Sequence, residues 1–223
     1  MHFFDEVYQG TPPWDNGRPQ PEFVQLEAEG RIVGRVLDVG CGTGENALFF
    51  AGRGHETWGI DFAPTAIRRA REKARERALP VRFEVASALE LAELHERFDT
   101  ITDSGLFHTF DDASRTRYAD SLCAALRPGG QVYLACFSEQ EPTDWGGPRR
   151  VTQAEIRETF GPPWEVRSIR AARFATRFPS VEGRAWLATI GIPDRVDDRK
   201  SRVRGKKERV PAPRRIRGAS TSP

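Results

Sequence analysis

The chain has few cysteines, and they are poorly placed for cross-links or metal sites. Its 223 residues include three, Cys41, Cys123 and Cys136, which are odd in number and widely spaced. A disulfide framework uses an even number of cysteines, and a zinc site uses closely spaced pairs. We therefore expect three reduced thiols in core elements and no metal site.

Long hydrophobic runs are also missing. No apolar stretch approaches the roughly 18 residues expected of a membrane span, and residues 1–6 (MHFFDE) do not resemble a signal peptide. Hydrophobic residues make up 38% of the chain, which suits a globular domain with a substantial core. We expect a cytoplasmic protein that has no membrane partner.

The charge is unevenly distributed along the chain. Residues 193–223 carry 11 Lys/Arg and 4 Asp/Glu, whereas the remainder carries 23 against 28. The part of the chain with a core is therefore mildly acidic, and the excess basic charge belongs to the C-terminal segment. Apolar residues are isolated in this segment, so we expect it to be disordered.

A glycine-rich turn follows a short apolar stretch. Residues 36–39 (VLDV) lack helical spacing and are typical of a buried strand in a parallel sheet. Gly40, Gly42 and Gly44 come next and lead into residues 47–51 (ALFFA), which we expect to be helical. Such glycines allow the backbone to approach a ligand, and the first amides of the helix face it. We therefore expect a ligand at this turn.

The spacing of the turn indicates which ligand it suits. It reads Asp38-x-Gly-x-Gly-x-Gly, unlike the G-x-G-x-x-G pattern of dinucleotide-binding loops. Residues 54–61 predict a second strand ending in Asp61, placed where a carboxylate accepts the hydroxyls of an adenosine ribose. These motifs resemble the class I S-adenosylmethionine-dependent methyltransferases, to about residue 190. The resemblance implies S-adenosyl-L-methionine as the cofactor and S-adenosyl-L-homocysteine as the product.

The resemblance also implies the fold class, which is α/β. It predicts a Rossmann-like, seven-stranded sheet with helices on both faces and the last strand antiparallel. We expect residues 1–30 to form a helical and loop cover over the active site, residues 31–192 the methyltransferase domain, and residues 193–223 a basic disordered tail. Beyond the first two strands, the expected strands are 81–85, 98–103, 131–137, 164–169 and 185–190.

The family pattern implies a set of cofactor-binding residues. Residues 13–21 (PWDNGRPQP) resemble the leader of thiopurine-methyltransferase-like and mycobacterial heterocyclic-toxin methyltransferases, which folds over the cofactor. Ser87 stands where many class I enzymes carry Asp, and a contact from the Ala88 amide is still expected. Asp103 either orients a donor or acceptor group or caps a turn. The expected cofactor-binding residues are Trp14, Asp38, Gly40, Gly42, Gly44, Asp61, Phe62, Ser87, Ala88 and Asp103.

Candidate acceptor residues follow the predicted fourth strand. His108 is the candidate general base by type and position, with a purely structural hydrogen bond as the alternative. Aromatic side chains here suit a flat acceptor, although core packing is equally compatible with them. An arginine could bind an anionic group or simply be solvated. The candidate substrate residues are Phe107, Phe110, Trp145 and Arg149.

These patterns lead to one predicted function and leave an alternative open. We expect a monomer that transfers a methyl group to O, S or N of a small aromatic or heterocyclic acceptor. The alternative is a nucleic-acid-binding protein that uses the basic tail, with the folded domain as a scaffold or as an RNA methyltransferase. A dinucleotide oxidoreductase is disfavoured by the glycine spacing.

Overall fold

The computed structural model describes residues 2–142, 148–177 and 182–193. Two expectations concern other residues. Trp145, a candidate substrate residue, lies outside the described ranges, as does the basic segment after Pro193 on which the nucleic-acid alternative depends. Within the described ranges, no helix has the length and apolar character required to cross a membrane.

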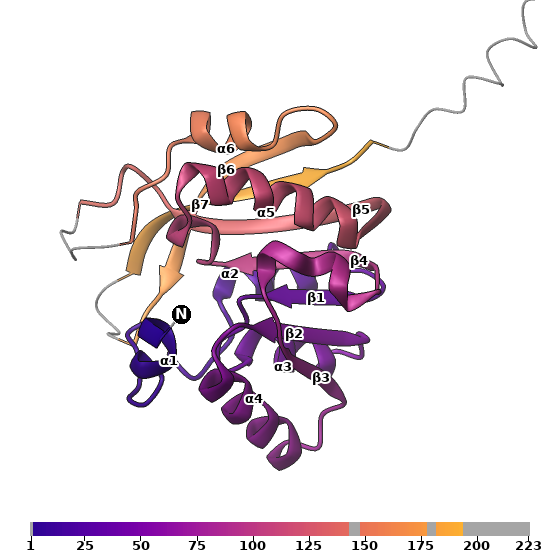
Figure 1. The fold of residues 1–223 in the computed structure, drawn as a ribbon, viewed down its shortest axis with the longest axis vertical. Coiled ribbons are helices and arrows are strands. Elements are labelled where there is room, and N and C mark those ends of the chain that lie inside the picture. Colours follow the sequence, from indigo (N-terminus) through magenta and orange to yellow (C-terminus); the bar gives the residue numbers. More distant parts are fainter. Residues whose placement is uncertain (1, 143–147, 178–181, 194–223) are drawn as a thin grey trace, which may run out of the picture. The chain divides into compact units, whose positions relative to one another are not determined.

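A single seven-stranded sheet runs through the described domain in the order β3-β2-β1-β4-β5-β7-β6 (Figure 1). Strands β1 to β5 pair in parallel, whereas β7 is antiparallel to both of its neighbours. The predicted fold class is therefore confirmed, including the antiparallel last strand. The strands are β1 Val36–Val39, β2 Thr57–Asp61, β3 Val81–Val85, β4 Phe98–Ser104, β5 Leu126–Phe137, β6 Glu165–Ala175 and β7 Glu182–Gly191.

Both faces of the central strands are apolar, because successive side chains of a strand point to opposite faces. In β1, Val36 packs into one cluster, and Leu37 and Val39 pack into another. In β5, Tyr133 and Leu134 divide in the same way. A sheet that is buried on both faces needs helices on each side.

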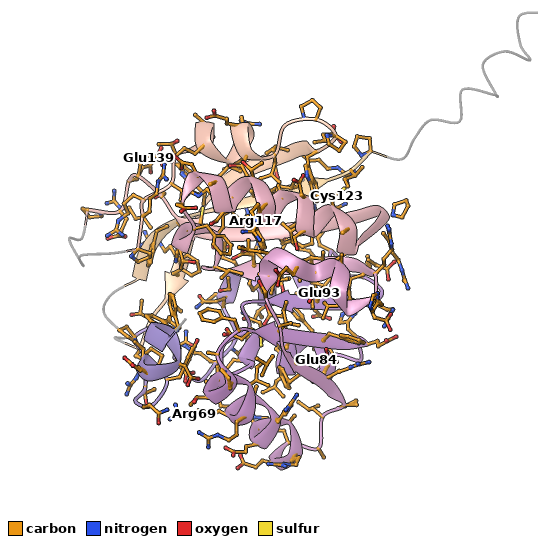
Figure 2. The ribbon with its side chains drawn as sticks, in the orientation of Figure 1. Arg69, Glu84, Glu93, Arg117, Cys123 and Glu139 are labelled. Carbon is orange, nitrogen blue, oxygen red and sulfur yellow. The ribbon has the colours of Figure 1, made fainter. Side chains whose placement is uncertain are left out.

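The helices provide that cover. Helices α2, α3 and α4 contribute to the clusters on one face, and η1, α5 and α6 to the cluster on the other. The exposed side chains of Glu93 on η1 and Arg117 on α5 are labelled in Figure 2. The helices are α1 His2–Val7, α2 Pro21–Ala28, α3 Glu45–Gly52, α4 Pro64–Glu76, the 3₁₀ turns η1 Ala88–Leu94 and η2 Phe107–Thr109, α5 Asp112–Ala125 and α6 Gln153–Thr159.

Local sequence signals determine where several helices begin. The Asp111 carboxylate accepts the Ser114 backbone N–H at 2.8 Å, which caps α5. Helix α6 starts with a capping box between Thr152 and Glu155. Strand β5 starts at Leu126, earlier than the expected residue 131, because Leu126 pairs with Phe98 before the register shifts.

The strand order positions a ligand crevice. From β1 the chain proceeds to β2 and β3 on one side, and it returns to β4 and β5 on the other. Ligands of open α/β sheets bind at the carboxyl ends of strands where the order reverses in this way. The neighbouring ends of β1 and β4 are therefore where a site is expected.

We predict that Gly44→Ala destabilises the fold more than Gly54→Ala does. Both glycines have a positive φ, 86° and 95°, so alanine costs roughly 1–2 kcal/mol of backbone strain at either position. A Cβ at Gly44 would also lie 2.6 Å from Phe83 Cζ, whereas nothing lies within 4 Å at Gly54. This overpacking adds about 1–3 kcal/mol, measurable by urea unfolding. Equal losses for the two variants would contradict the prediction.

Candidate functional site

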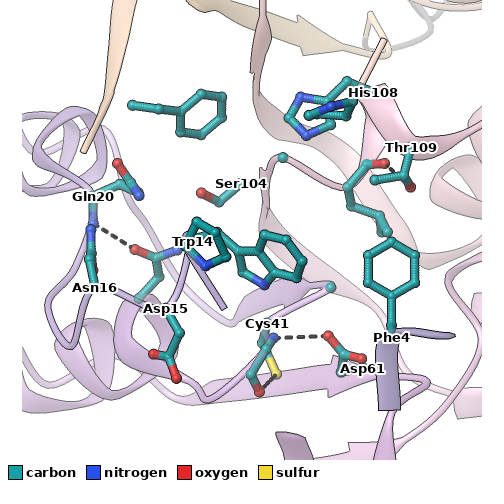
Figure 3. Close-up of a pocket in the computed structure, with 18 of the residues that line it drawn as sticks. Phe4, Trp14, Asp15, Asn16, Gln20, Cys41, Asp61, Ser104, His108 and Thr109 are labelled. Atoms are coloured by element: carbon teal, nitrogen blue, oxygen red, sulfur yellow. Dashed lines mark hydrogen bonds between the residues drawn. The ribbon is translucent and has the colours of Figure 1, made fainter. Parts of the chain in front are cut away.

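A pocket of about 1030 Å³ opens at the carboxyl ends of the parallel strands. Its walls come from the N-terminal segment, the turn after β1, the end of β2, the segment after β4, and the ends of β5 and β6. In the view of Figure 3, Trp14 lies between Asp61 and Cys41 on one side and Ser104 and His108 on the other. The predicted site residues that line it are Trp14, Gly40, Gly42, Asp61, Phe62, His108, Phe110 and Arg149.

Gly42 is tightly enclosed within this pocket. Its φ is 54°, and a Cβ added there would lie 2.6 Å from Tyr8 Oη. The residue must therefore lack a side chain for two reasons: the backbone conformation and the proximity of Tyr8. Burial raises the pKa of Tyr8, so its hydroxyl remains protonated beside the turn.

Asp61 holds the turn after β1 against the end of β2. Its carboxylate accepts the backbone N–H of Gly42 and that of Ala63, each at 2.9 Å. Burial raises the pKa of Asp61, while these two hydrogen bonds act in the opposite direction. Phe62 follows directly and lies edge-on to Phe4, with ring centroids 5.7 Å apart. A carboxylate and an aromatic face thus adjoin the glycine turn.

Five expected cofactor residues do not line the pocket: Asp38, Gly44, Ser87, Ala88 and Asp103. Asp103 is fully buried, where its carboxylate accepts two backbone N–H groups of the following turn and the Tyr118 hydroxyl at 2.8 Å. Ser87 Oγ accepts the Leu89 N–H and caps η1. Of the roles considered for Asp103, the geometry matches the turn cap.

Asp38 is a buried carboxyl in the strand that leads into the glycine turn. One oxygen accepts the Thr102 hydroxyl at 2.9 Å, and the other, Oδ2, has no hydrogen-bond partner in the part of the chain that the structure describes. Burial, together with the negative charge of the nearby Asp103, raises the pKa of Asp38 to about 7, although the Thr102 hydrogen bond acts in the opposite direction. The Asp38 carboxyl is therefore partly protonated near neutral pH.

Hydrogen bonds hold the N-terminal segment, residues 2–20, over the pocket. The Trp14 indole N–H donates to Tyr8 Oη at 3.0 Å, and Asp15 accepts the Thr43 hydroxyl at 2.7 Å. Gln20 pairs through its side chain with both the N–H and the C=O of Ala175, at 2.9 and 3.0 Å. This segment therefore joins the turn after β1 to the far edge of the sheet.

His108 lines the pocket, although only 6% of its surface is exposed. Its Nδ1 accepts the backbone N–H of Phe137 at 3.0 Å. The ring stacks on Phe137 with an interplanar angle of 9°, and Phe174 lies edge-on to it. Burial, with the positive charges of Arg150 and Arg115, lowers the pKa of His108 to about 3. The imidazole is therefore neutral.

Phe107 is placed differently from the expectation that it contacts substrate. It is fully buried in the main core cluster beside Tyr118 and Phe160 and does not line the pocket. The reason is the 3₁₀ turn η2, which directs Phe107 inward and leaves Phe110 partly exposed at the pocket. Arg149 lines the pocket, but it is paired with two carboxylates, Asp112 and Glu155.

Several lining residues were not predicted from the sequence as site residues. They include Tyr8 and Gln20 of the N-terminal segment, Asn46 at the start of α3, and Phe137 and Phe174 in the last strands. Phe137 had a usable signal, since it ends a parallel strand at the carboxyl edge. In the described residues, no group of three or more His, Cys, Asp or Glu side chains could hold a metal ion.

A seven-stranded sheet in this order with β7 antiparallel, a glycine turn after β1 and a carboxylate at the end of β2 are the features of a Rossmann-like methyltransferase. Residues 36–130 match a family model described as a methyltransferase domain. Together with the relatives below, this shows that the chain belongs to the S-adenosylmethionine-dependent methyltransferases.

Two similar proteins illustrate this membership, and a third shares only the fold. A curated 2-heptyl-1-hydroxyquinolin-4(1H)-one methyltransferase from Mycobacteroides abscessus is 42% identical, over 84% of this chain and 93% of that protein. A solved structure described as "Conversion of a Disulfide Bond into a Thioacetal Group during Echinomycin Biosynthesis" has a TM-score of 0.80 at 36% identity, over 94% of this chain and 99% of that one. Magnesium protoporphyrin IX methyltransferase from Synechocystis, solved with bound S-adenosylmethionine, shares the fold with a TM-score of 0.58 at 19% identity. The match covers 83% of this chain and 79% of that one.

We predict that Asp38→Asn changes how stability depends on pH. With a folded pKa of about 7 against an ordinary 3.8, the folded chain keeps a proton that the unfolded chain releases between about pH 4 and 7. Stability of the original protein therefore falls with rising pH across that window, and the penalty is constant above it. Asparagine removes this dependence.

The measurement is the melting temperature of both proteins from pH 4 to 8. The original protein is expected to lose stability relative to Asp38→Asn as pH rises to about 7. Asp120, which is exposed on α5, gives the matched control Asp120→Asn. Parallel curves for the original protein and Asp38→Asn would contradict the prediction.

Proposed function

We propose that this methyltransferase transfers the methyl group of S-adenosyl-L-methionine to O, S or N of a small, flat aromatic or heterocyclic acceptor. The observation that carries the proposal is one continuous pocket with two unlike halves. One half contains the glycine turn and Asp61, and the other contains His108 and the rings of Phe110, Phe137 and Phe174. The 42% identical relative, named for a hydroxyquinolone, supports an acceptor of this kind.

The residues of the first half fit the donor. Asp61 reaches the pocket beside Gly42, and its carboxylate suits the ribose hydroxyls. The backbone at Gly40 and Gly42 suits the amino acid part of the donor, and Phe62 offers an aromatic face to the adenine. Trp14 would cover them from the N-terminal segment. When bound, the donor supplies an electrophilic methyl group on a sulfonium.

The residues of the second half suit a planar acceptor. Phe137 and Phe174 lie 5.0 Å apart between ring centroids, with an interplanar angle of 64°. Such an edge-to-face pair leaves an apolar wall, and flat ligands are bound by walls of this type. Arg149 remains a candidate for an anionic substituent at the rim, although Asp112 and Glu155 already partner it.

The protein's contribution to the reaction is then mainly alignment in a site from which water is excluded. Holding two reactants in line can supply on the order of 7–11 kcal/mol of the barrier. The N-terminal segment contributes by closing the pocket between the turn after β1 and Ala175 of β6. Exclusion of water also prevents competing hydrolysis.

The same reasoning supports the proposed organisation of the chain. Residues 1–30 would form the cover, residues 31–192 the catalytic domain and residues 193–223 a basic tail. We also propose that the protein acts as a monomer on a small molecule. We also propose a cytoplasmic location, which the three free cysteines support.

The test of the function is transfer of a labelled methyl group from S-adenosyl-L-methionine. The acceptors to be screened are 1-hydroxyquinolin-4(1H)-ones, hydroxyquinolines, phenols, aromatic thiols and bulk RNA. Turnover of a flat small molecule is the expected result. Labelling of RNA alone would overturn the assignment of the acceptor class.

We predict that Asp61→Ala weakens donor binding. The loss of hydrogen bonds to a charged group should reduce affinity by roughly 1–3 kcal/mol, which is about five-fold to more than a hundred-fold in Kd. Calorimetry with S-adenosyl-L-homocysteine measures this. Glu84→Ala, on the adjacent strand and outside the pocket lining, is the control. Unchanged affinity in Asp61→Ala would remove the ribose role.

A further inference from the structure

The hydrogen bond at His108 determines which ring nitrogen carries the proton. A backbone N–H can only donate, so Nδ1, which accepts from Phe137 at 3.0 Å, must have a free lone pair. The other nitrogen of a neutral imidazole, Nε2, then carries the hydrogen. His108 therefore has an N–H group, and no lone pair, at Nε2.

The Phe137 amide has this partner because of where β4 ends. The pairing of β4 with β5 stops at Ser104 opposite Ala135. Phe137 is two residues further along β5, so its amide points to the same side of β5 as that of Ala135, towards β4. Strand β4 has already ended there and offers no carbonyl. A buried amide needs an acceptor, and His108 on the following turn supplies it.

Nε2 faces the pocket. Among the described residues, Nε2 has no hydrogen-bond partner. It is also absent from the unpartnered side-chain atoms that are fully buried, so it is accessible from the pocket. Gly105, which also lines the pocket, leaves room beside it, because a Cβ at Gly105 would lie 3.3 Å from Nε2. Figure 3 shows the His108 ring at the pocket, on the same side as Ser104. An entering molecule can therefore contact the Nε2–H.

The charged groups around His108 do not favour its action as a base. A general-base histidine typically has a carboxylate on its second nitrogen, which stabilises the imidazolium. Here that nitrogen accepts an N–H, and the charges that act on the ring are those of Arg150 and Arg115. The Arg115 side chain is 3% exposed and pairs with Glu155 through Nη1 at 3.2 Å, while its Nε and Nη2 have no partners within the described ranges. The positive charges of the two arginines disfavour the imidazolium that a general base must form.

We propose that His108 binds the acceptor as a hydrogen-bond donor, and that the enzyme accepts aromatic oxyanions and thiolates, which have lost their proton before they enter the pocket. This inference rests on the proposed function and specifies its substrate class. A lone pair of the acceptor anion forms the bond to the methyl carbon, and the electron pair of the carbon–sulfur bond stays with sulfur. No proton is removed within the site.

The hydrogen bond most useful for turnover goes to a second heteroatom of the acceptor. Negative charge on the attacking atom decreases in the transition state, so a donor on that atom would stabilise the ground state more. A second oxygen or nitrogen of the acceptor, whose lone pair forms no bond to the methyl group, can accept from Nε2–H throughout. The predicted acceptor therefore carries a second hydrogen-bond-accepting heteroatom on a flat ring system.

The first experiment examines the protein without turnover. Long-range ¹H–¹⁵N correlation spectra of the full chain report the tautomer of His108, with His108→Gln used to assign its signals. The expected result is a neutral ring protonated at Nε2 from pH 5 to 9. An imidazolium, or a neutral ring protonated at Nδ1, would overturn the proposal whether or not an acceptor is known.

The second experiment uses 1-hydroxyquinolin-4(1H)-ones whose ring substituents shift the pKa of the hydroxyl. The acid limb of kcat/KM is expected to move with the pKa of each acceptor. A midpoint that is the same for all acceptors and disappears in His108→Gln would identify His108 as a base and overturn the proposal. If no acceptor in the screen is methylated, the proposed function fails, and the tautomer measurement still decides the state of His108.

A pair of variants distinguishes the role of Nε2–H as a donor in the pocket from the hydrogen bond between Nδ1 and the Phe137 amide. His108→Asn can still accept the Phe137 N–H, but it is too short to reach into the pocket, whereas His108→Gln extends an amide N–H towards the position of Nε2. Calorimetry in the presence of S-adenosyl-L-homocysteine should show Kd for the acceptor anion rising by roughly ten-fold or more in His108→Asn, and by less in His108→Gln. His55→Gln, outside the pocket lining, is the control. Equal acceptor affinity in His108→Asn and the original protein would overturn the donor role.

Discussion

The parallel strands end at a common edge, and the backbone amides left there without a strand partner must find acceptors elsewhere. Side chains supply those acceptors. The Asp61 and Asp103 carboxylates each accept two backbone N–H groups, His108 accepts that of Phe137, and Gln20 pairs with both polar backbone groups of the last residue of β6. A buried amide without a partner costs about 1–3 kcal/mol, so these bonds constrain the site before any ligand enters.

This constraint determines which chemistry the site residues can perform. Asp103 is occupied by the turn that it caps, and Arg149 is occupied by two carboxylates. Within the described part of the chain, His108 retains one N–H without a partner, because its other nitrogen accepts the backbone N–H of Phe137. The pocket therefore offers shape, aromatic walls and a hydrogen-bond donor, which suits an enzyme whose main contribution is to align two reactants.

Sequence reasoning succeeded where the signal was local. The strand before the glycine turn, Asp61 at the end of β2 and the antiparallel last strand are all present as predicted. It was less accurate where a residue's environment depends on distant segments. Nothing in the sequence distinguishes Phe107 from Phe110 as a candidate substrate residue. The 3₁₀ turn η2 directs Phe107 into the core and leaves Phe110 at the pocket.

The sequence by itself determined the half of the pocket that contains the glycine turn and Asp61, because a strand, a glycine turn and an acid two elements later act through short-range backbone geometry. Only the tertiary structure decided the half that contains His108 and the aromatic rings. Its walls come from segments far apart in the chain, and Gln20 and Ala175, which close it, are 155 residues apart. The proton position on His108 was decided at this level too, since it depends on the place where β4 stops beside β5.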